Sequence, residues 1–407
     1  MAFLTLVEFV MVYLWGWLIL TILASVAAFL LLKKYYRTEI AVFGIVAVVG
    51  LVAIMFGPKI FPKAFEYPAF LTTFGPSDGP ALPFKSAFAF LKNFSKMEKV
   101  ENIARNPNDI PPPIERTYPE KVKINLTTKE VIAEVAPGTF VNYWTFNGTV
   151  PGPFLRVREG DEVELTLTND PSSVHAHNID LHAVNGPGGG AVLTNVDPGE
   201  TKTFTFQALN PGLYVYHCAH PNVATHDTHG MYGLILVEPI GGLTRVDKEF
   251  YVMQGELYTT GDIGKKGLQI FDAVKMLNGR PEYIVFNGKP SALTTNVKAK
   301  VGDRVRFFVG NGGVNLISSF HIIGEIFDTV YPEASIGGAL FKNVQTTIVP
   351  AGGAAITESL LNVPGKYPFV DHALARIERG AWGILEVTGE ENPAVLSGTY
   401  DAADHSH

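Results

Sequence analysis

One cysteine and seven of the eleven histidines lie between residues 175 and 229, where the sequence carries its densest set of reactive side chains. Cys218 is followed by His226 and then by Met231, and His177 comes from an earlier segment. A thiolate, two imidazoles and a weak thioether are the ligands of blue-copper electron-transfer sites. Zinc would fill its four positions without the thioether, so this set favours copper.

A second metal site follows from how side chains alternate along a strand. His217 directly precedes Cys218, and successive strand residues point to opposite faces, so both cannot easily bind one metal. The same argument separates His182 from His177. His182 and His217 are then free for a second metal, and Asp180 shares a face with His182 in an extended chain. A third imidazole must come from elsewhere.

The chain contains an internal repeat, and its second copy supplies a candidate for the third imidazole. Four motifs recur in the same order, which indicates duplication of one fold. The matched pairs are Phe-Asn-Gly at 146–148 and 286–288, Gly-Asp at 160–161 and 302–303, Pro-Gly-x-Tyr at 211–214 and 364–367, and a strand beginning Tyr-Gly at 232 or Trp-Gly at 382. His372 falls near the position of His217 but no cysteine follows it, so His372 can bind a metal only at an interface between copies.

Both copies show the pattern of β-strands. Val163–Thr168 and Lys202–Phe206 alternate polar and apolar residues between clusters of turn-forming residues. The 40 glycines and 27 prolines also favour a turn-rich β protein. We expect two antiparallel β-sandwiches at 116–240 and 241–390, followed by a flexible tail at 391–407.

Taken together, the motifs resemble those of the copper-containing nitrite reductases. They are H-N-I-D-L-H at 177–182, Y-H-C-A at 216–219, H-x4-M at 226–231, S-F-H-I-I at 319–323 and V-D-H at 370–372, all in that family's order. The similarity extends from about Arg116 to Val387. It implies an all-β chain of two tandem cupredoxin-like Greek-key β-sandwiches with two coppers, type 1 and type 2, per chain.

The resemblance also assigns roles to single residues. The matches to the type 1 copper ligands are His177, Cys218, His226 and Met231. The matches to the type 2 copper ligands are His182, His217 and His372, with His372 coming from a neighbouring subunit of a homotrimer. The matches to the family's other functional residues are Asp180 and His321 as catalytic acid/base residues, Ile323 as the apolar side chain beside the ligand position, and Thr346 as the hydroxyl that supports the catalytic histidine.

The implied reaction is the one-electron reduction of nitrite to nitric oxide and water, which consumes two protons. A three-histidine metal site leaves a position open where nitrite can displace water. Asp180 could accept and return a proton, and His321 could supply the second proton. The His217–Cys218 dipeptide would give the electron a short covalent route between the two coppers.

Two other functions are compatible with part of this pattern. A multicopper oxidase needs several H-x-H pairs and an H-C-H motif, whereas this chain has H-x-H only at 175–177 and in the C-terminal tail at 405–407, and Tyr-His-Cys-Ala in place of H-C-H. A membrane-anchored cupredoxin electron carrier would leave Asp180, His182, His321 and His372 unexplained. Nucleic-acid binding is disfavoured by the net charge of −7 and the absence of a basic stripe.

The N-terminal region predicts a membrane anchor at 1–57. Phe9–Leu32 and Ile40–Phe56 contain no charged residue and are long enough to span a bilayer as helices. The first run is too long for the apolar part of a cleaved signal peptide. Because basic residues at 33–37 separate the runs, the positive-inside rule puts that loop in the cytoplasm. Both termini and the catalytic domains would then be periplasmic, at a bacterial inner membrane.

A Pro/Phe-rich linker is expected at 58–115. Within it, Phe84–Met97 could form a short helix that lies in the lipid headgroup layer or packs against the globular part. Pro111–Pro113 would act as a stiff spacer. An anchor and a linker of this kind suggest membrane quinol as the electron donor, with a periplasmic cytochrome or cupredoxin as the alternative.

Overall fold

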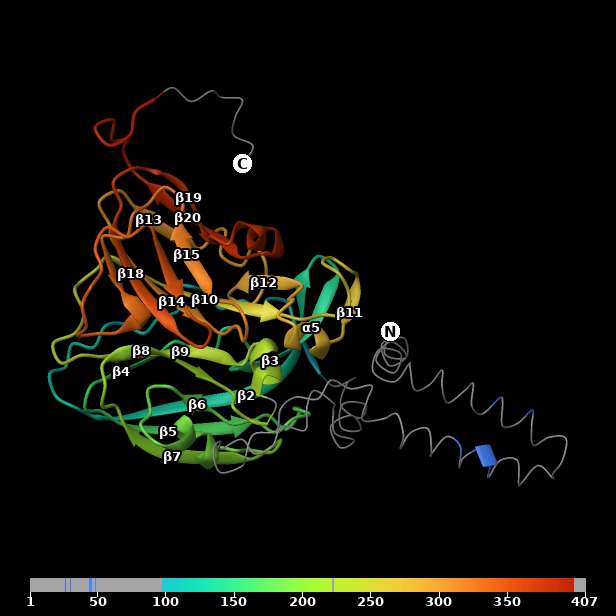
Figure 1. Cartoon of the computed structure of the whole chain (residues 1–407). Coiled ribbons are helices and arrows are strands. Elements are labelled where there is room, and N and C mark those ends of the chain that lie inside the picture. The colour runs from blue at the N-terminus through green and yellow to red at the C-terminus, as the bar shows by residue number, and fades with distance from the viewer. Residues whose placement is uncertain are drawn as a thin grey trace.

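The computed structural model describes residues 97–221 and 223–398, together with five isolated positions before residue 49. Over this part the chain forms two β-sandwiches that pack against each other (Figure 1). The predicted anchor and the Phe84–Met97 helix lie outside the described residues, except for Met97 and those isolated positions. No helix in the described ranges is long and apolar enough to cross a membrane.

The first sandwich contains nine strands and two short helices. They are β1 (Glu98–Val100), β2 (Lys121–Ala136), β3 (Thr139–Phe146), β4 (Leu155–Arg158), β5 (Glu162–Asn169), β6 (Asp180–Leu181), the 3-10 helix η2 (Pro187–Leu193), β7 (Thr201–Gln207), β8 (Gly212–His217), α4 (Val223–Thr228) and β9 (Tyr232–Glu238). One sheet has the order β11-β3-β2-β5-β7 with β1 beside β2, and the other has the order β4-β9-β8-β6.

The second sandwich follows directly. Its elements are β10 (Lys248–Leu257), β11 (Gly267–Gln269), α5 (Ala273–Leu277), β12 (Tyr283–Phe286), β13 (Val297–Lys300), β14 (Arg304–Asn311), β15 (Ser318–Ile322), β16 (Thr329–Tyr331), η3 (Pro332–Ala334), β17 (Thr346–Val349), β18 (Ala354–Leu360), β19 (Gly365–Asp371), η4 (Leu374–Arg379) and β20 (Trp382–Thr388). Its sheets have the orders β12-β10-β14-β18-β16 and β13-β20-β19-β15-β17.

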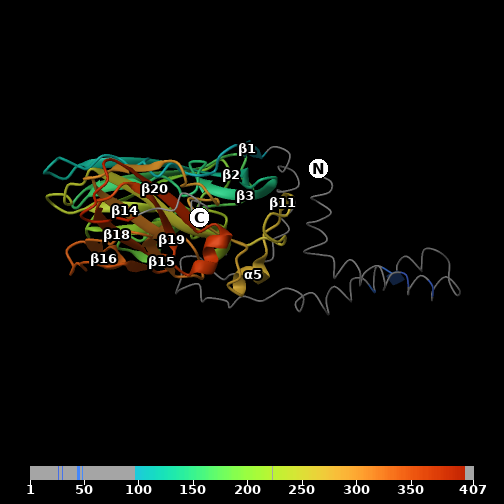
Figure 2. The same ribbon diagram turned by 90° about the horizontal axis from the view of Figure 1, so that it is seen from above.

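One segment between the strands of the second sandwich packs against the first sandwich. Strand β11 pairs with β3 of the first sandwich, and both β11 and α5 project at the same side of the molecule (Figure 2). The sheet that carries β3 therefore contains residues from both halves of the chain. The two sandwiches are joined by backbone hydrogen bonds as well as by side-chain packing.

The expectation of purely antiparallel sandwiches is wrong. Each of the four described sheets contains a parallel pair, namely β2·β5, β4·β9, β10·β14 and β13·β20. The reason is that the chain crosses to the opposite sheet and returns, as it does through β4 between β2 and β5. A returning strand can lie parallel to an earlier one, and alternation along the sequence does not report that direction.

The alternation itself is confirmed. In β5, Val163, Leu165 and Leu167 are fully buried while the intervening residues face outward. These three side chains belong to the core of the first sandwich, which also includes Cys218 and Met231. The apolar face of a predicted strand therefore supports the residues singled out for chemistry.

The internal repeat is also visible in three dimensions. Asn147 and Asn287 both adopt a positive φ, 58° and 48°. Each side-chain oxygen accepts a backbone N–H from a neighbouring strand, from Thr127 in the first copy and from Met253 in the second. The shared Phe-Asn-Gly motif thus builds the same turn twice, as expected for a duplicated fold.

Part of the predicted linker packs on the first sandwich. Strand β1 pairs with β2 in parallel, Ile103 is fully buried, and the Arg105 N–H donates to the Val150 carbonyl. Met97 contacts Ile132 in a small apolar cluster. From residue 97 onward this segment is therefore part of the folded body.

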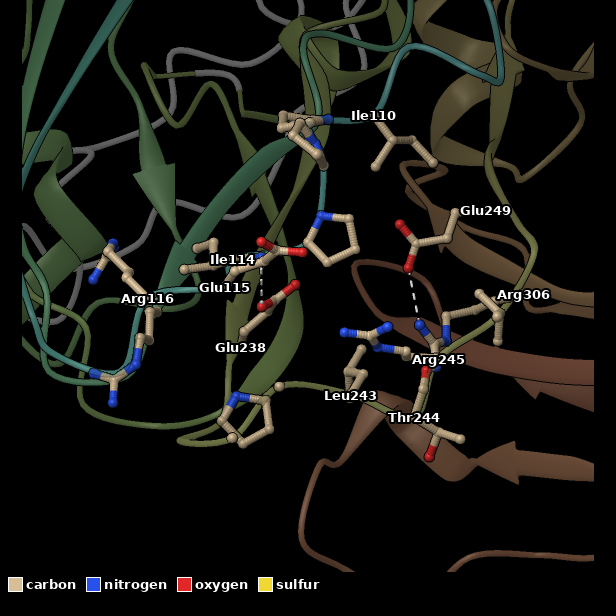
Figure 3. A pocket seen from close by; sticks show the side chains of 18 of the residues that line it. Ile110, Ile114, Glu115, Arg116, Glu238, Leu243, Thr244, Arg245, Glu249 and Arg306 are labelled. Atoms are coloured by element: carbon tan, nitrogen blue, oxygen red, sulfur yellow. Dashed lines mark hydrogen bonds and ion pairs between the residues drawn. The ribbon is translucent and has the colours of Figure 1, made fainter.

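A cavity of about 1210 Å³ lies beside the connection between the sandwiches, and its lining contains no histidine (Figure 3). Pro111–Pro113 form part of its wall, and Glu249 on β10 lies against Arg306 on β14. Glu249 accepts hydrogen bonds from Arg156 of the first sandwich (2.7 Å) and from Arg306 (2.9 Å). Glu238 and Glu358 each form a further ion pair with one of the two arginines. The cavity therefore lies beside a network of buried ion pairs that connects the two sandwiches, which we call the ionic joint.

Replacing Glu249 by Gln should destabilise the protein. Both guanidinium groups are almost completely buried, and they would lose the carboxylate that they share. A buried ion pair that loses one partner costs roughly 3 kcal/mol. Chemical unfolding should show the loss, whereas Glu162→Gln, which removes an exposed ion pair with Lys121, should change little. Equal behaviour of the two variants would contradict the joint.

Candidate metal centres

Three predicted ligands converge in the core of the first sandwich, and we call them the Cys218 cluster. His177, Cys218 and His226 each offer a ligand atom within 4.8 Å of the others, and all three are buried. The Cys218 Sγ lies 3.8 Å from His177 Nδ1 and 3.3 Å from His226 Nδ1, and the two Nδ1 atoms are 3.2 Å apart. The distances leave room for one ion between the three atoms.

Neighbouring backbone holds the sulfur in place. The N–H of Asn178 points at the Cys218 Sγ (3.5 Å), and the Asn178 side-chain oxygen accepts the N–H of Ala219 (2.7 Å). Asn178 therefore ties the segment that carries His177 to the loop that carries the cysteine. The sequence pattern gave Asn178 no role, although it lies inside the H-N-I-D-L-H motif.

The fourth predicted ligand, Met231, closes the loop. Its carbonyl accepts the N–H of Cys218, and its own N–H donates to the His226 carbonyl. Met231 is fully buried in the same apolar cluster as Cys218. The short helix α4 carries His226 between these two points, so one compact loop presents three of the four predicted ligands.

Burial suits the Cys218 cluster to a metal. It lowers the pKa of His177 and puts the pKa of His226 well below its usual value, so both rings are neutral and can donate a lone pair. Burial also raises the pKa of the Cys218 thiol to about 12. A metal ion must therefore displace the thiol proton. A soft thiolate with two imidazoles fits copper.

A second group, the His217 cluster, consists of Asp180, His182 and His217. Asp180 on β6 lies directly opposite His217 on β8, and the Nε2 atoms of His182 and His217 are 3.1 Å apart. His217 and Cys218 are adjacent in sequence but belong to different clusters. The predicted division of this dipeptide between two metal groups agrees with the geometry.

A glycine run lets the backbone approach Asp180. Gly189 in η2 has a φ of +52°, and a Cβ at this position would lie 1.9 Å from the Asp180 Oδ1. No larger residue fits there without moving the carboxylate. The loop at 186–190 therefore sets the place of Asp180 beside the two histidines.

The His217 ring has a carboxylate behind it. Asp227 Oδ1 lies 3.4 Å from His217 Nδ1, and the Cys218 carbonyl lies 3.2 Å from the same nitrogen. Although burial acts in the opposite direction, Asp227 raises the pKa of His217 to about 9. Both acceptors keep the Nδ1 proton on that side, which leaves Nε2 to face His182 and a metal.

His182 is placed from the second sandwich. Burial of its ring lowers its pKa, the neighbouring His217 lowers it further, and a hydrogen bond with the Gly352 backbone counteracts part of this effect. Gly352 belongs to the β17–β18 turn, and a Cβ added to it would lie 3.8 Å from the His182 Cε1. The His217 cluster therefore depends on the packing of both halves of the chain.

The predicted residues of the second sandwich form a separate pair. His321 and His372 lie with ring centroids 5.1 Å apart, and the His321 Nδ1–H donates to the Gln345 carbonyl (2.6 Å). His372 and Ile323 are exposed, and Thr346 pairs with His321 across β15 and β17. Within the described chain, neither histidine joins the His217 cluster.

The backbone around His372 is fixed by a buried carboxylate. Asp371 is fully buried and accepts the N–H groups of Ser319 and Ala373. Its other oxygen binds Arg376 in η4 (2.5 Å). These contacts hold the backbone at His372 in place at the surface. The V-D-H motif located His372 but did not indicate the structural role of Asp371.

Three further histidines lie near the Cys218 cluster. Rings of His175 and His229 lie 4.2 and 4.1 Å from Trp144, with His229 stacked on it. The His220 Nδ1 lies within hydrogen-bond distance of the Asn195 side chain (2.7 Å). Against the effect of burial, His175 and His177 hold the pKa of Glu130 below its usual range. The sequence pattern assigned none of these three histidines a role, and none joins a metal group in the described chain.

Comparison with known proteins decides the family. A sequence profile of the family described as multicopper oxidase matches residues 103–241, the first sandwich. The copper-containing nitrite reductase of Neisseria meningitidis serogroup A is 52% identical over 302 residues, which cover 73% of this chain and 78% of that protein. The chain belongs to the copper-containing nitrite reductase family. Copper is accordingly its cofactor, and the protein is an oxidoreductase, as the sequence predicted.

Solved structures agree with this family and with the fold. A copper nitrite reductase from Nitrosomonas europaea is 34% identical with a TM-score of 0.60, covering 67% of this chain and 96% of that one. A crystal structure of a multicopper oxidase is 28% identical with a TM-score of 0.57, covering 69% and 95%. The mostly β, cupredoxin-like architecture is therefore shared by both kinds of copper protein.

Copper-free protein should lose stability as the pH rises from about 6.5 to about 9. A group whose pKa is raised by folding stabilises the fold below its unfolded pKa, 6.5 for His217, and loses that contribution through the folded pKa, about 9. Asp227→Asn should remove this decline. The check is the unfolding midpoint against pH, compared with Asp197→Asn. A decline of the same size in both variants would contradict the assignment.

Proposed function

We propose that this chain reduces nitrite to nitric oxide and water, using one electron and two protons and two coppers per chain. The observation that carries the proposal is the division of His217 and Cys218 between two metal groups. An electron carrier needs only the Cys218 cluster. The second group, with a carboxylate among its members, supplies a place for a substrate and a proton donor beside it.

The chain's donor sets fit two different kinds of copper. His177, Cys218, His226 and Met231 would hold type 1 copper in the buried core. His182 and His217 would hold type 2 copper, together with His372 from a neighbouring subunit. Bound copper would supply a one-electron carrier at the first set and a Lewis acid with an open position at the second.

A homotrimer accounts for the missing third imidazole. The His217 cluster has two histidines in the described chain, and His372 is exposed on a rigid strand end. An exposed histidine that faces another subunit would complete a three-imidazole site. Because His321 lies beside His372, the same subunit would bring both residues to the substrate.

The protons have two sources among these residues. Asp180 lies with the two histidines of the His217 cluster, where it can take up a proton and return it to an oxygen of nitrite. His321 would supply the second proton through Nε2, since its Nδ1–H is held by the Gln345 carbonyl. Ile323 would limit the space for the anion, and Thr346 would support His321 from β17.

Asp180→Asn should retain both coppers and lose most nitrite turnover, about 10²-fold or more, since an amide cannot act as a proton carrier. Copper quantification and nitric oxide production test this together. Two coppers per chain are expected, whereas a multicopper oxidase would hold four and a cupredoxin carrier one. Asp197→Asn, on an exposed turn, is the matched control. Near-normal turnover in a fully loaded Asp180→Asn enzyme would overturn the assignment.

A second candidate function is that of a multicopper oxidase, and the match to the multicopper oxidase profile supports it. It covers the first sandwich, which both kinds of enzyme share. The sequence has H-x-H pairs only at 175–177 and 405–407 and no H-C-H motif, which argues against a trinuclear cluster. Nitrite reduction is therefore the function that the residues support best.

We further propose that the N-terminal runs at 1–57 anchor the enzyme in a bacterial inner membrane, with both termini and the catalytic domains in the periplasm. Membrane quinol would then be the electron donor. The support is the uncharged composition of the two runs and the basic loop between them.

Enzyme in a bilayer should turn over nitrite with a reduced quinol analogue. A version without residues 1–57 should lose that activity and keep turnover with a small artificial reductant. The check is nitric oxide release from both proteins with both donors. Activity of the anchored enzyme with reduced cytochrome alone would show that the anchor is only a tether.

A further inference from the structure

The His177 ring has a polar group beside each of its two nitrogens. Its Nδ1 faces the Cys218 Sγ and the His226 Nδ1. Its Nε2 lies 3.5 Å from the Glu130 Oε1. If Nδ1 is the ligand atom, the proton must reside on Nε2, and Glu130 is the acceptor in front of it.

Glu130 is an unusual residue for its position. It lies on β2, its side chain has no exposed surface, and in the described chain its ion-pair partners are His175 and His177, with no lysine or arginine. Burying a carboxylate without a cationic partner is costly. A charge retained at such a position calls for a cation or a metal nearby to interact with it.

The groups around Glu130 are hydrogen-bond donors. Oε1 accepts the backbone N–H groups of Val174 and His175, both at 2.7 Å. It also lies 3.0 Å from the His175 Nδ1. Three donors around one oxygen, besides His177, suit an ionised carboxylate. They also anchor the segment that leads to His177, so the ring and its acceptor are held on one support.

We propose that Glu130 is a positioning residue for the type 1 copper ligand His177, and that its buried charge lowers the reduction potential of that copper. The inference rests on the proposed function, because it requires copper in the Cys218 cluster. A carboxylate that accepts the second N–H of a metal-bound imidazole fixes the ring and increases its basicity. A negative charge one imidazole away favours the oxidised, more positive metal.

The test is Glu130→Gln in the copper-loaded enzyme. The amide has nearly the same shape and can still accept from Nε2–H, but it carries no charge. Redox titration of the type 1 visible absorption should give a more positive potential than in the natural protein. The type 2 electron paramagnetic resonance signal should not change.

Glu134→Gln is the matched control. Glu134 lies on the same strand and accepts the N–H of Gly138, away from the histidines. Its substitution should leave the potential unchanged. If the Glu130→Gln variant has the same potential as the natural protein and the control, the proposal is overturned. The charge of Glu130 would then have no effect on the copper, and its role would be purely structural.

A second measurement covers the case in which Glu130→Gln does not fold or load copper. The reduced-minus-oxidised infrared spectrum of the natural enzyme should contain a carboxylate band that moves when type 1 copper changes charge, and Glu130→Asp should shift it. A spectrum without any carboxylate band would overturn the proposal. Failure of the proposed function is distinct, since the natural enzyme would then lack the type 1 absorption or nitrite turnover.

Discussion

The extended backbone at His217 and Cys218 is the constraint on which the rest of the site depends. Because neighbouring side chains of a strand leave on opposite faces, one dipeptide serves two clusters that never share a ligand. Cys218 enters the apolar core, and His217 faces Asp180 and His182. Both faces of β8 pack against apolar residues, with Leu213 and Val215 in one core cluster and Tyr216 in the other, so the His217 cluster can form only at the end of the strand.

The two environments differ as their chemistry requires. The Cys218 cluster is enclosed by apolar residues and by the loop that ends at Met231, which suits a site that exchanges only electrons. The His217 cluster lies at the edge, where η2 and the turn at Gly352 meet it. His182 is exposed there, so a reactant and protons can reach that edge.

The residues that bind or react are predictable from the sequence where their partners are close in the chain. The motifs around His177 and Cys218 located both clusters, because ligand spacing in strands and tight loops is local. Glu130 and Asp227 could not be predicted, because their partners lie on other elements and a single acidic residue in a strand or short helix does not indicate what it faces. Strand direction and the packing of residues 97–115 also arise only from long-range contacts.

Helix α4 adds a connection of a different kind. His226 belongs to the Cys218 cluster, while Asp227, the next residue, contacts His217. These four residues are therefore joined in a ring. Peptide bonds link His217 to Cys218 and His226 to Asp227, and side-chain contacts link Cys218 to His226 and Asp227 to His217. Residues 219–225 connect the two dipeptides, so both side-chain contacts constrain the length of this segment. Lengthening or shortening that segment would disturb both clusters at once, and neither could adapt alone.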